Sequence, residues 1–581
     1  DVCSSDLIFI IGVNMSDNKS VVKPTYRYEV DNLNQSSWKI NKRGGSLIHD
    51  PLLNKGTGFS EQEREELGLL GLVPPKVVSI DDQVKRIQEN FNRLPGPFEK
   101  YIFLEALHDR NETLYFKVLI DNLEELTPIV YTPTVGKACE HYGHIYRRAR
   151  GMYFSTRNRG HFREMMNNWA QDEIDIIVVT DGSRILGLGD LGCNGMGISI
   201  GKLALYVSCA GIYPSKTLPA VLDVGTNNEE LLVDPLYLGV NHRRLTGDDY
   251  YEMVDEFVTA ALDKWPDALI QFEDFTNDHA FPLLEKYRHK IVCFNDDIQG
   301  TGSVALAGVL SGLRITGEKL IDQRIVFLGA GSAAIGIANM IAAGMVEEGY
   351  TVEKARERFW FIDTKGLVTN NRGDKLADHK IPFARDEEYV KALVDVVKKV
   401  KPTILMGLSG QPGSFSKEVI EELNRHVDKP LIFALSNPTS KAECTAEQAY
   451  TWTDGNGIFS SGSPFDPVNY KGKLLSPGQG NNMYIFPGVG LGASVCKSTE
   501  VTDSMFYIAA KTLAEMVTDE SLDCGNLYPK LSNIREISLK IAVAVCQVAY
   551  SEGLARLEKP ENLEDFVENS MFSPYYIPYS K

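Results

Sequence analysis

The sequence has little of what would place it among membrane, secreted or nucleic-acid-binding proteins. None of the apolar runs in its 581 residues is long enough to span a bilayer. Its nine cysteines are scattered and form no C-x-x-C pair, so we expect reduced thiols and no disulfide framework. Its 60 basic side chains do not balance its 78 acidic ones, and the net charge of −18 argues against general binding to nucleic acid or an anionic membrane.

The first fourteen residues also lack the features of a targeting signal. Their apolar run is short, has no basic flank and is followed by no small-residue cleavage site. The segment after Met15 is not an Arg-rich, acid-poor transit peptide either. We therefore expect residues 1–14 to be a non-native leader before a natural start at Met15. The expected compartment is the cytoplasm, with the mitochondrion as the alternative.

The patterns that are present predict an α/β protein of two or three domains. Helical periodicity dominates residues 15–148, which we expect to form a mostly helical N-terminal domain with subunit contacts. Beyond it, short apolar strands alternate with helices, as in doubly wound folds. We predict a central α/β substrate and metal domain over 149–295 with 482–554. A Rossmann-type dinucleotide-binding domain is predicted over 296–481, and a tail over 555–581 whose aromatic end is expected to dock on a neighbouring subunit.

The clearest nucleotide-binding signal follows the apolar stretch 324–328. A G-x-G-x-x-A motif stands there and opens a helix, so its backbone amides can hold a pyrophosphate. A second apolar strand ends in Asp363, later than the usual spacing of about twenty residues. A G-x-G-x-x-G pattern at 187–192 has no such acid and predicts a tight glycine hairpin instead. The predicted dinucleotide-binding residues are Gly329, Ala330, Gly331, Ser332, Ala333, Ala334 and Asp363.

Two acidic pairs stand at the ends of apolar runs, Glu273 with Asp274 and Asp296 with Asp297. Buried carboxylates need compensation, and an all-oxygen site favours Mg²⁺ or Mn²⁺. The alternative is that these acids cap the helices that follow. In a straight strand Glu273 and Asp274 would also point to opposite faces, so both can hold one ion only if the strand has already turned.

Other polar residues stand at positions that allow either a structural or a chemical role. Tyr131 is expected where a strand meets a loop, as a packing residue or a proton donor. Lys202 lies in an apolar helix, where it either reaches solvent or has a lowered pKa and serves as a base. Asn437 follows a strand at the edge where ligands gather. Asn481 and Asn482, in a glycine-rich loop, are turn formers more often than ligands.

Together these motifs resemble the malic enzyme family, in the same order from about residue 30 to the end. The segments that carry the resemblance are 131–136, 180–197, 272–275, 294–301, 435–439 and 480–488. The resemblance implies oxidative decarboxylation of L-malate to pyruvate and carbon dioxide, with a nicotinamide dinucleotide and Mg²⁺ or Mn²⁺. It also implies a homotetramer built from two dimers.

The resemblance assigns roles to particular residues. It implies Tyr131 as general acid and Lys202 as general base. From its place beside a proposed ligand, we add the hypothesis that Asp296 adjusts the charge of that lysine. Asp297 is implied both as a metal ligand and beside the cofactor, and Asn437 beside both cofactor and substrate. The implied metal ligands are Glu273, Asp274 and Asp297, and the implied substrate contacts are Arg184, Asn437, Asn481 and Asn482.

The choice of dinucleotide depends on residues near Asp363. This acid should favour a ribose 2′-hydroxyl, and therefore NAD. However, Thr364 is small and Lys380 stands where NADP-using malic enzymes resemble one another in carrying a lysine, so we predict NADP with NAD as the alternative. Two other functions stay open: a metal-dependent oxaloacetate decarboxylase with a structural dinucleotide, and a catalytically silent binding subunit. The second would require loss of a key residue, and none is missing.

Overall fold

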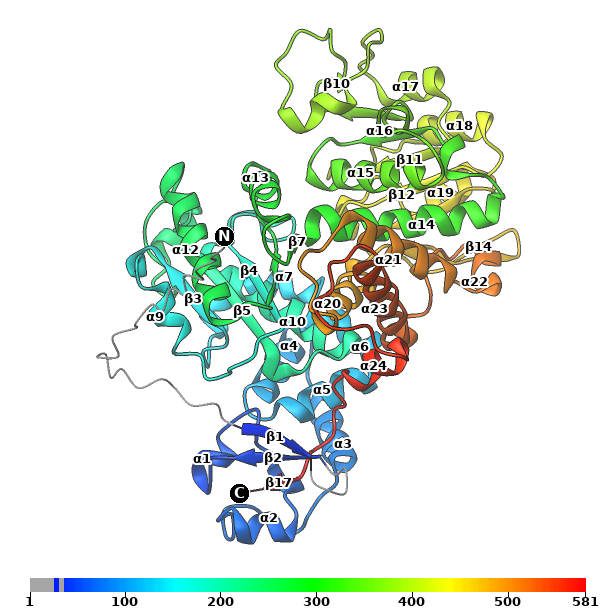
Figure 1. Ribbon diagram of the computed structural model, residues 1–581. Coiled ribbons are helices and arrows are strands. Elements are labelled where there is room, and N and C mark those ends of the chain that lie inside the picture. The colour runs from blue at the N-terminus through cyan, green and yellow to red at the C-terminus, as the bar shows by residue number, and fades with distance from the viewer. Residues whose placement is uncertain (1–25, 31–35, 581) are drawn as a thin grey trace, which may run out of the picture.

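The computed structural model describes residues 26–30 and 36–580, so the expected leader lies outside the described residues. Figure 1 shows three regions, with the N-terminal helices at the bottom, a five-stranded sheet in the middle and a seven-stranded sheet at the top. In the part of the chain that is described, no helix combines the length and apolar content needed to cross a bilayer. The predicted α/β architecture is confirmed.

The N-terminal region is mostly helical, as predicted. The capping box of Ser60 and Glu63 opens α2 (Glu61–Glu66). One expectation was wrong: the segment before Tyr131 is not a strand, because α6 runs to Val130. Its apolar residues recur at helical spacing and are buried, and they outweigh Pro128 inside the helix. The longer helices here are α3 (Ile80–Phe91), α4 (Pro97–His108), α5 (Glu112–Asp121), α6 (Leu123–Val130) and α7 (Thr134–Glu140).

The middle sheet is entirely parallel, with strand order β3-β5-β4-β6-β7. All residues of β4 and β6 are buried, as expected for strands covered on both faces. Its strands are β3 (Met152–Ser155), β4 (Ile176–Thr180), β5 (Thr217–Asp223), β6 (Leu269–Phe272) and β7 (Cys293–Asn295). The helices beside it include α9 (Phe162–Met166), α10 (Met196–Ala210), α12 (Asp248–Lys264) and α13 (Asn277–Tyr287).

The upper sheet has the order β10-β9-β8-β11-β12-β13-β16, parallel except for β10. From β8 the strand order runs to β9 on one side and to β11 on the other. The boundary between β8 and β11 is therefore the switch point where doubly wound sheets bind ligands. The strands are β8 (Ile325–Leu328), β9 (Phe359–Asp363), β10 (Gly366–Leu367), β11 (Ile404–Gly407), β12 (Leu431–Ala434), β13 (Ile458–Ser461) and β16 (Gly478–Gln479). Its helices include α14 (Thr301–Thr316), α15 (Ser332–Glu347), α17 (Leu393–Val400), α18 (Lys417–His426) and α19 (Ala446–Trp452).

Helices from late in the chain pack between the two larger sheets (Figure 1). They are α20 (Phe486–Val495), α21 (Asp503–Glu515) and α23 (Ile534–Ser551). A Cβ atom on Gly488 would lie 2.8 Å from Cβ of Ile541, so glycine is what lets α20 and α23 approach. The sheets fall inside the predicted ranges 149–295 and 296–481, whose exact boundaries stay a prediction.

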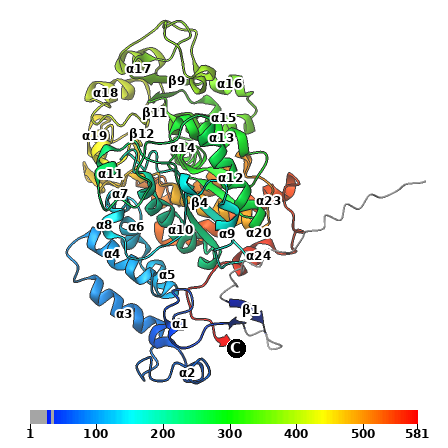
Figure 2. The ribbon, with the colours of Figure 1, turned by 90° about the vertical axis from the view of Figure 1, so that its left-hand side faces the viewer.

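The C-terminal tail packs on the N-terminal region of its own chain, and its expected docking on a neighbouring subunit stays a prediction. Its strand β17 (Tyr579–Ser580) pairs with β2 (Ser36–Ile40), which also pairs with β1 (Tyr26–Val30). The ring of Tyr579 stacks on Trp38 at 6.1 Å, and Nζ of Lys55 lies 3.7 Å from its centre. Figure 2 shows the C-terminus close to β1. Strand pairing and aromatic contacts within the chain therefore hold the end of the tail in place.

Candidate active site

The carboxyl edge of the middle sheet brings three carboxylates together. Glu273 and Asp274 follow β6, and Asp297 follows the end of β7. One oxygen from each lies within 4.8 Å of the others. Asp274 has a φ of 57°, in the left-handed region, so the chain has left the strand and the neighbouring side chains can converge. This turn removes the objection that a straight strand would separate them.

Hydrogen bonds fix the orientation of two of these carboxylates. The amide of Leu186 donates to Oδ2 of Asp274 at 3.0 Å, and Nε2 of Gln271 donates to Oε2 of Glu273 at 2.8 Å. Burial raises the pKa of all three carboxyls, and repulsion from neighbouring carboxylates adds to the rise. An all-oxygen set that is buried and mutually repelling fits a hard divalent cation.

Lys202 lies beside this cluster, on the fully buried helix α10. Its Nζ donates to Oδ2 of Asp296 at 2.5 Å and lies 3.0 Å from Oε1 of Glu273. Burial lowers the pKa of Lys202, but Asp296 and Glu273 outweigh it and raise the pKa well above its usual value. The expected lowering of this pKa was therefore wrong, because the carboxylates that raise it come from distant segments that the local pattern cannot show.

Tyr131 ends helix α6 and faces the same lysine. Nζ of Lys202 lies 5.3 Å from the centre of its ring. Burial raises the pKa of Tyr131 well above its usual value, although Lys202 opposes the rise. The phenol therefore keeps its proton and can donate it.

Asp296 and Asn482 connect this cluster to the late segment of the chain. Nδ2 of Asn482 donates to Oδ2 of Asp296 at 2.9 Å and to the Thr301 hydroxyl at 2.9 Å. A Cβ atom on Gly300 would lie 1.8 Å from Oδ1 of Asp296, so only glycine fits there. The side chain of Asn481 instead accepts the amide of Met483 at 3.0 Å, which is the turn-forming role.

Arg184 links the two larger sheets. It follows β4, and its Nη1 donates to Oδ1 of Asn277 and to the hydroxyl of Ser332, both at 3.2 Å. The backbone of Asn437 approaches the loop that carries Arg184, since a Cβ atom on Gly187 would lie 3.4 Å from the backbone carbonyl oxygen of Asn437. Its Oδ1 accepts from the Ser463 hydroxyl at 2.6 Å. Arg184 thus reaches the start of α15 in the dinucleotide motif, whereas Asn437 borders the loop at Gly187.

The sequence-based prediction missed a group of contacts around Asp181, which follows the same strand as Arg184. Asp181 is fully buried and lies 2.8 Å from Nη2 of Arg244, which also reaches Asp190 at 3.2 Å. Tyr250 donates to Asp181 at 2.8 Å. Asp181 follows β4 just as Glu273 follows β6, so its position was a usable signal. No comparable signal in the sequence indicated Arg244.

The glycine turn after β8 has the geometry of a dinucleotide loop. Gly329 has a φ of 116°, and a Cβ there would lie 2.5 Å from the Leu408 carbonyl, so no other residue fits. Gly331 precedes the first residue of α15, Ser332. The free amides at this helix start lie at the switch point of the sheet, where a pyrophosphate is favoured. Ala330, Ala333 and Ala334 complete the turn and the first helical residues.

Asp363, at the end of β9, is held by two cations. Arg372 donates to both its oxygens at 2.8 Å, and Nζ of Lys380 lies 2.8 Å from Oδ2. Burial raises the pKa of Asp363, but these hydrogen bonds outweigh it and hold the pKa well below its usual range. The negative charge that would repel a 2′-phosphate is therefore balanced.

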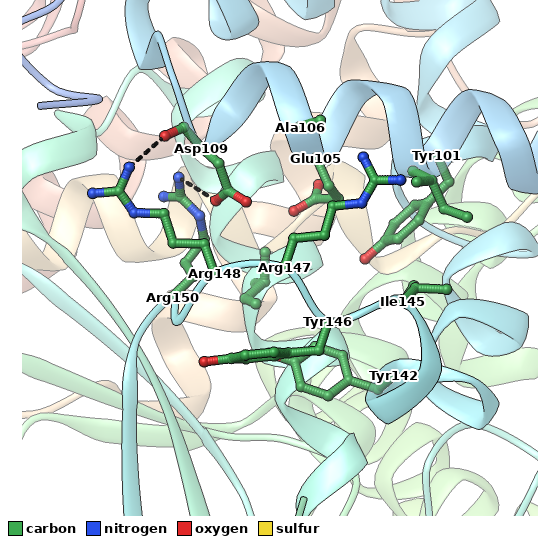
Figure 3. A pocket seen from close by; sticks show the side chains of 12 residues that line it. Tyr101, Glu105, Ala106, Asp109, Tyr142, Ile145, Tyr146, Arg147, Arg148 and Arg150 are labelled. Atoms are coloured by element: carbon green, nitrogen blue, oxygen red, sulfur yellow. Dashed lines mark hydrogen bonds and ion pairs between the residues drawn. The ribbon is translucent and has the colours of Figure 1, made fainter. Parts of the chain in front are cut away.

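A separate cavity of about 50 Å³ lies between α4 and residues 142–150 (Figure 3). Burial raises the pKa of Glu105 to about 7 and lowers that of His108 to about 3. Arg150 is paired with Glu112 at 2.7 Å and lies 3.4 Å from Asp109. None of the carboxylates or glycines described above lines this cavity, so we assign it to packing between helices.

Comparisons with known proteins show which family this chain resembles. Family models described as "Malic enzyme, N-terminal domain" and "Malic enzyme, NAD binding domain" match residues 108–288 and 298–550. The NADP-dependent malic enzyme of Dictyostelium discoideum is 55% identical over 533 residues, 91% of this chain and 98% of that protein. The Rattus norvegicus NADP-dependent malic enzyme is 50% identical, over 92% and 94%. The crystal structure of Entamoeba histolytica malic enzyme shares the fold, with a TM-score of 0.55 and 22% identity over 87% of this chain and 91% of that one.

Proposed function

We propose, because this chain belongs to the malic enzyme family, that it catalyses the oxidative decarboxylation of L-malate to pyruvate and carbon dioxide with NADP as the oxidant. One observation carries the chemical part of the proposal: three carboxylates, two of them buried, lie together with a buried lysine, and Arg184 spans from their sheet edge to the dinucleotide turn. A hydroxy-acid and a nicotinamide can meet at such an edge.

Lys202 and the dinucleotide take the two hydrogens of the alcohol. As the base, Lys202 accepts the hydroxyl proton while hydride leaves C2 for the nicotinamide, giving oxaloacetate and NADPH. This needs a neutral amine, so the pull of Glu273 and Asp296 on the ammonium must weaken in the working enzyme. Glu273, Asp274 and Asp297 would hold Mg²⁺ or Mn²⁺, which would supply positive charge for the carbonyl oxygen and offset the charge of Glu273.

Tyr131 completes the reaction. Breaking the C3–C4 bond releases carbon dioxide and leaves the electron pair on the enolate of pyruvate. We assign Tyr131 as the donor that protonates C3, because burial keeps its hydroxyl protonated beside Lys202. Asp296 holds Lys202 in place, and Asn482 holds Asp296.

The substrate is proposed to lie between Arg184, Asn437 and Asn482. A guanidinium matches a carboxylate of malate in charge and geometry. For this, Arg184 would exchange its two neutral hydrogen bonds, which are long at 3.2 Å, for a charged one. Asn481 is assigned to shaping the turn that presents Asn482.

NADP is proposed over NAD on the balance of charge around Asp363. Arg372 neutralises this carboxylate through both oxygens, so Lys380 is available to a 2′-phosphate at modest cost. We further propose a homotetramer of two dimers, measurable by light scattering, and the cytoplasm as the compartment, measurable by cell fractionation.

An absorbance assay at the wavelength of NADPH tests the function. With L-malate and Mn²⁺ we expect reduction of NADP and stoichiometric pyruvate. Lys380→Gln should lower kcat/KM for NADP by about tenfold or more, as expected for a lost contact with a charged phosphate, while kcat/KM for NAD changes little. Lys375→Gln, a nearby lysine without a bond to Asp363, is the control. Oxaloacetate decarboxylation without malate-dependent reduction would support a decarboxylase instead.

A further inference from the structure

Glu443 is a buried carboxylate that the reaction described above does not use. Its side chain is 0% exposed, and its oxygens accept hydrogen bonds from two serines only. They are the amide and hydroxyl of Ser409 at 2.9 and 3.1 Å, and the hydroxyl and amide of Ser436 at 2.5 and 3.4 Å. Across residues 36–580 the structure gives Glu443 no ion-pair partner. A buried charge with only neutral donors is costly, so an apolar residue would serve packing better.

Glu443 connects two loops at the carboxyl edge of the upper sheet. Ser409 follows β11 and Ser436 follows β12, and the two strands are neighbours with Gly407 opposite Ala434. The Ser436 hydroxyl also accepts the amide of Gly410 at 2.9 Å. Strand β11 borders the switch point, and Asp363 lies on the opposite side of β8. Glu443 therefore connects the loops after β11 and β12, on the side of the switch point away from Asp363.

The side chain of Glu443 packs directly against the backbone of strand β11 at Gly407. A Cβ atom on Gly407 would lie 2.5 Å from Cδ of Glu443. Strand β11 can therefore approach Glu443 only because position 407 is glycine. Substitution of that glycine offers a way to move the carboxylate without changing it.

Each loop held by Glu443 leads to a part of the proposed site. Ser436 directly precedes Asn437, the residue assigned to substrate and nicotinamide. Leu408, directly before Ser409, presents the carbonyl that limits Gly329 in the dinucleotide turn. We propose that Glu443 is a positioning residue, which sets Asn437 against the glycine turn and so fixes the nicotinamide end of the dinucleotide relative to malate. This inference rests on the proposed function.

The experiment compares ligands that use different ends of the dinucleotide site. Glu443→Gln keeps the size of the side chain but turns one acceptor oxygen into a donor. We expect KM for malate and Kd for NADPH to rise by about tenfold, since small displacements of positioning groups have effects of this size. The Kd of adenosine 2′,5′-bisphosphate, which lacks the nicotinamide half of the dinucleotide, should stay within about twofold. Gly407→Ala should give the same pattern with the carboxylate intact.

Glu63→Gln is the matched control, because Glu63 is a buried carboxylate bonded to Lys55 far from the site. It should lower Tm and leave all three constants unchanged. Unchanged constants in both Glu443→Gln and Gly407→Ala would overturn the inference, and so would equal weakening of NADPH and the bisphosphate. A wild type that is inactive with malate would overturn the proposed function alone. The Kd values of NADPH and of the bisphosphate would still test the positioning role of Glu443.

Discussion

At the scale of single residues, burial and charge act on Lys202 in opposite directions. Burial alone lowers the pKa of Lys202, which suits a base. Asp296 and Glu273 raise its pKa again, and Glu273 is also one of the proposed metal ligands. The protonation of the base is thus coupled to the charge of the carboxylates around it.

Asp296→Asn tests this coupling. Asp296 is the largest contribution that raises the pKa of Lys202, so its removal should lower that pKa. A base is active above its pKa, and the rising limb of log kcat/KM against pH should therefore move to lower pH. Asp223→Asn, a buried carboxylate at the end of β5, should leave the limb in place. An unmoved limb in Asp296→Asn would contradict the assignment of Lys202.

Tyr131→Phe tests the proton donor. Removing a general acid costs about 100-fold or more in rate, so kcat should fall by at least that factor. The Kd of NADPH should remain unchanged, because the phenol is not assigned to the dinucleotide. Tyr142→Phe, which removes a buried hydroxyl bonded to Tyr153, is the control. Normal kcat in Tyr131→Phe would assign the donor to another group.

At the scale of elements, the tail shows how an aromatic segment finds a partner. Lys55 is buried, and its ammonium donates to the Ile577 carbonyl at 2.6 Å while facing the ring of Tyr579. The tail therefore completes the environment of a charge inside the N-terminal region. A segment that looks unattached in the sequence is held by contacts more than 500 positions away.

Tyr579→Ala should destabilise the N-terminal region. It removes a stacked pair and a cation–π contact, together about 2 kcal/mol, and should lower Tm and speed proteolysis before residue 112. Tyr575→Ala, where the side chain is 53% exposed and loses only a cation–π contact with Lys117, should cost about 0.5–1 kcal/mol. Equal effects of the two substitutions would show that the tail does not depend on Tyr579.

At the scale of the whole molecule, the proposed metal site joins segments that would otherwise repel one another. Three carboxylates, of which Glu273 and Asp274 are buried and Asp297 is partly exposed, follow two strand ends, and Lys202 compensates only part of their charge. A cation bound there would favour the folded state by mass action. Stability should therefore depend on the metal even without substrate.

Melting with and without Mn²⁺ measures this dependence. At a concentration about 100 times its Kd, the ion should stabilise the fold by about 2.7 kcal/mol and raise Tm, and EDTA should reverse the rise. Asp274→Asn should lose most of it, whereas Asp223→Asn should keep it. A rise that survives in Asp274→Asn would place the ion elsewhere.

Much of the fold could be predicted from local patterns. The buried strands, the glycine turn at Gly329 and the acids after β6 and β7 were all visible, because strand burial, positive φ and a strand end each leave a short signature. The segment before Tyr131 was misassigned, since a helix carrying Pro128 resembles a strand leading to a turn. The ring of contacts around Asp363 was visible only as nearby basic residues.

The sequence by itself determined the chemistry that is available: which residues can hold a cation, move a proton or face a pyrophosphate. Only the tertiary structure decided which of them meet, because the pKa of Lys202, the pairing of Arg244 with Asp181, the hold of Glu443 on two loops and the docking of the tail depend on segments far apart in the chain. Burial and charge act through space, and the distances between such segments exist only after folding.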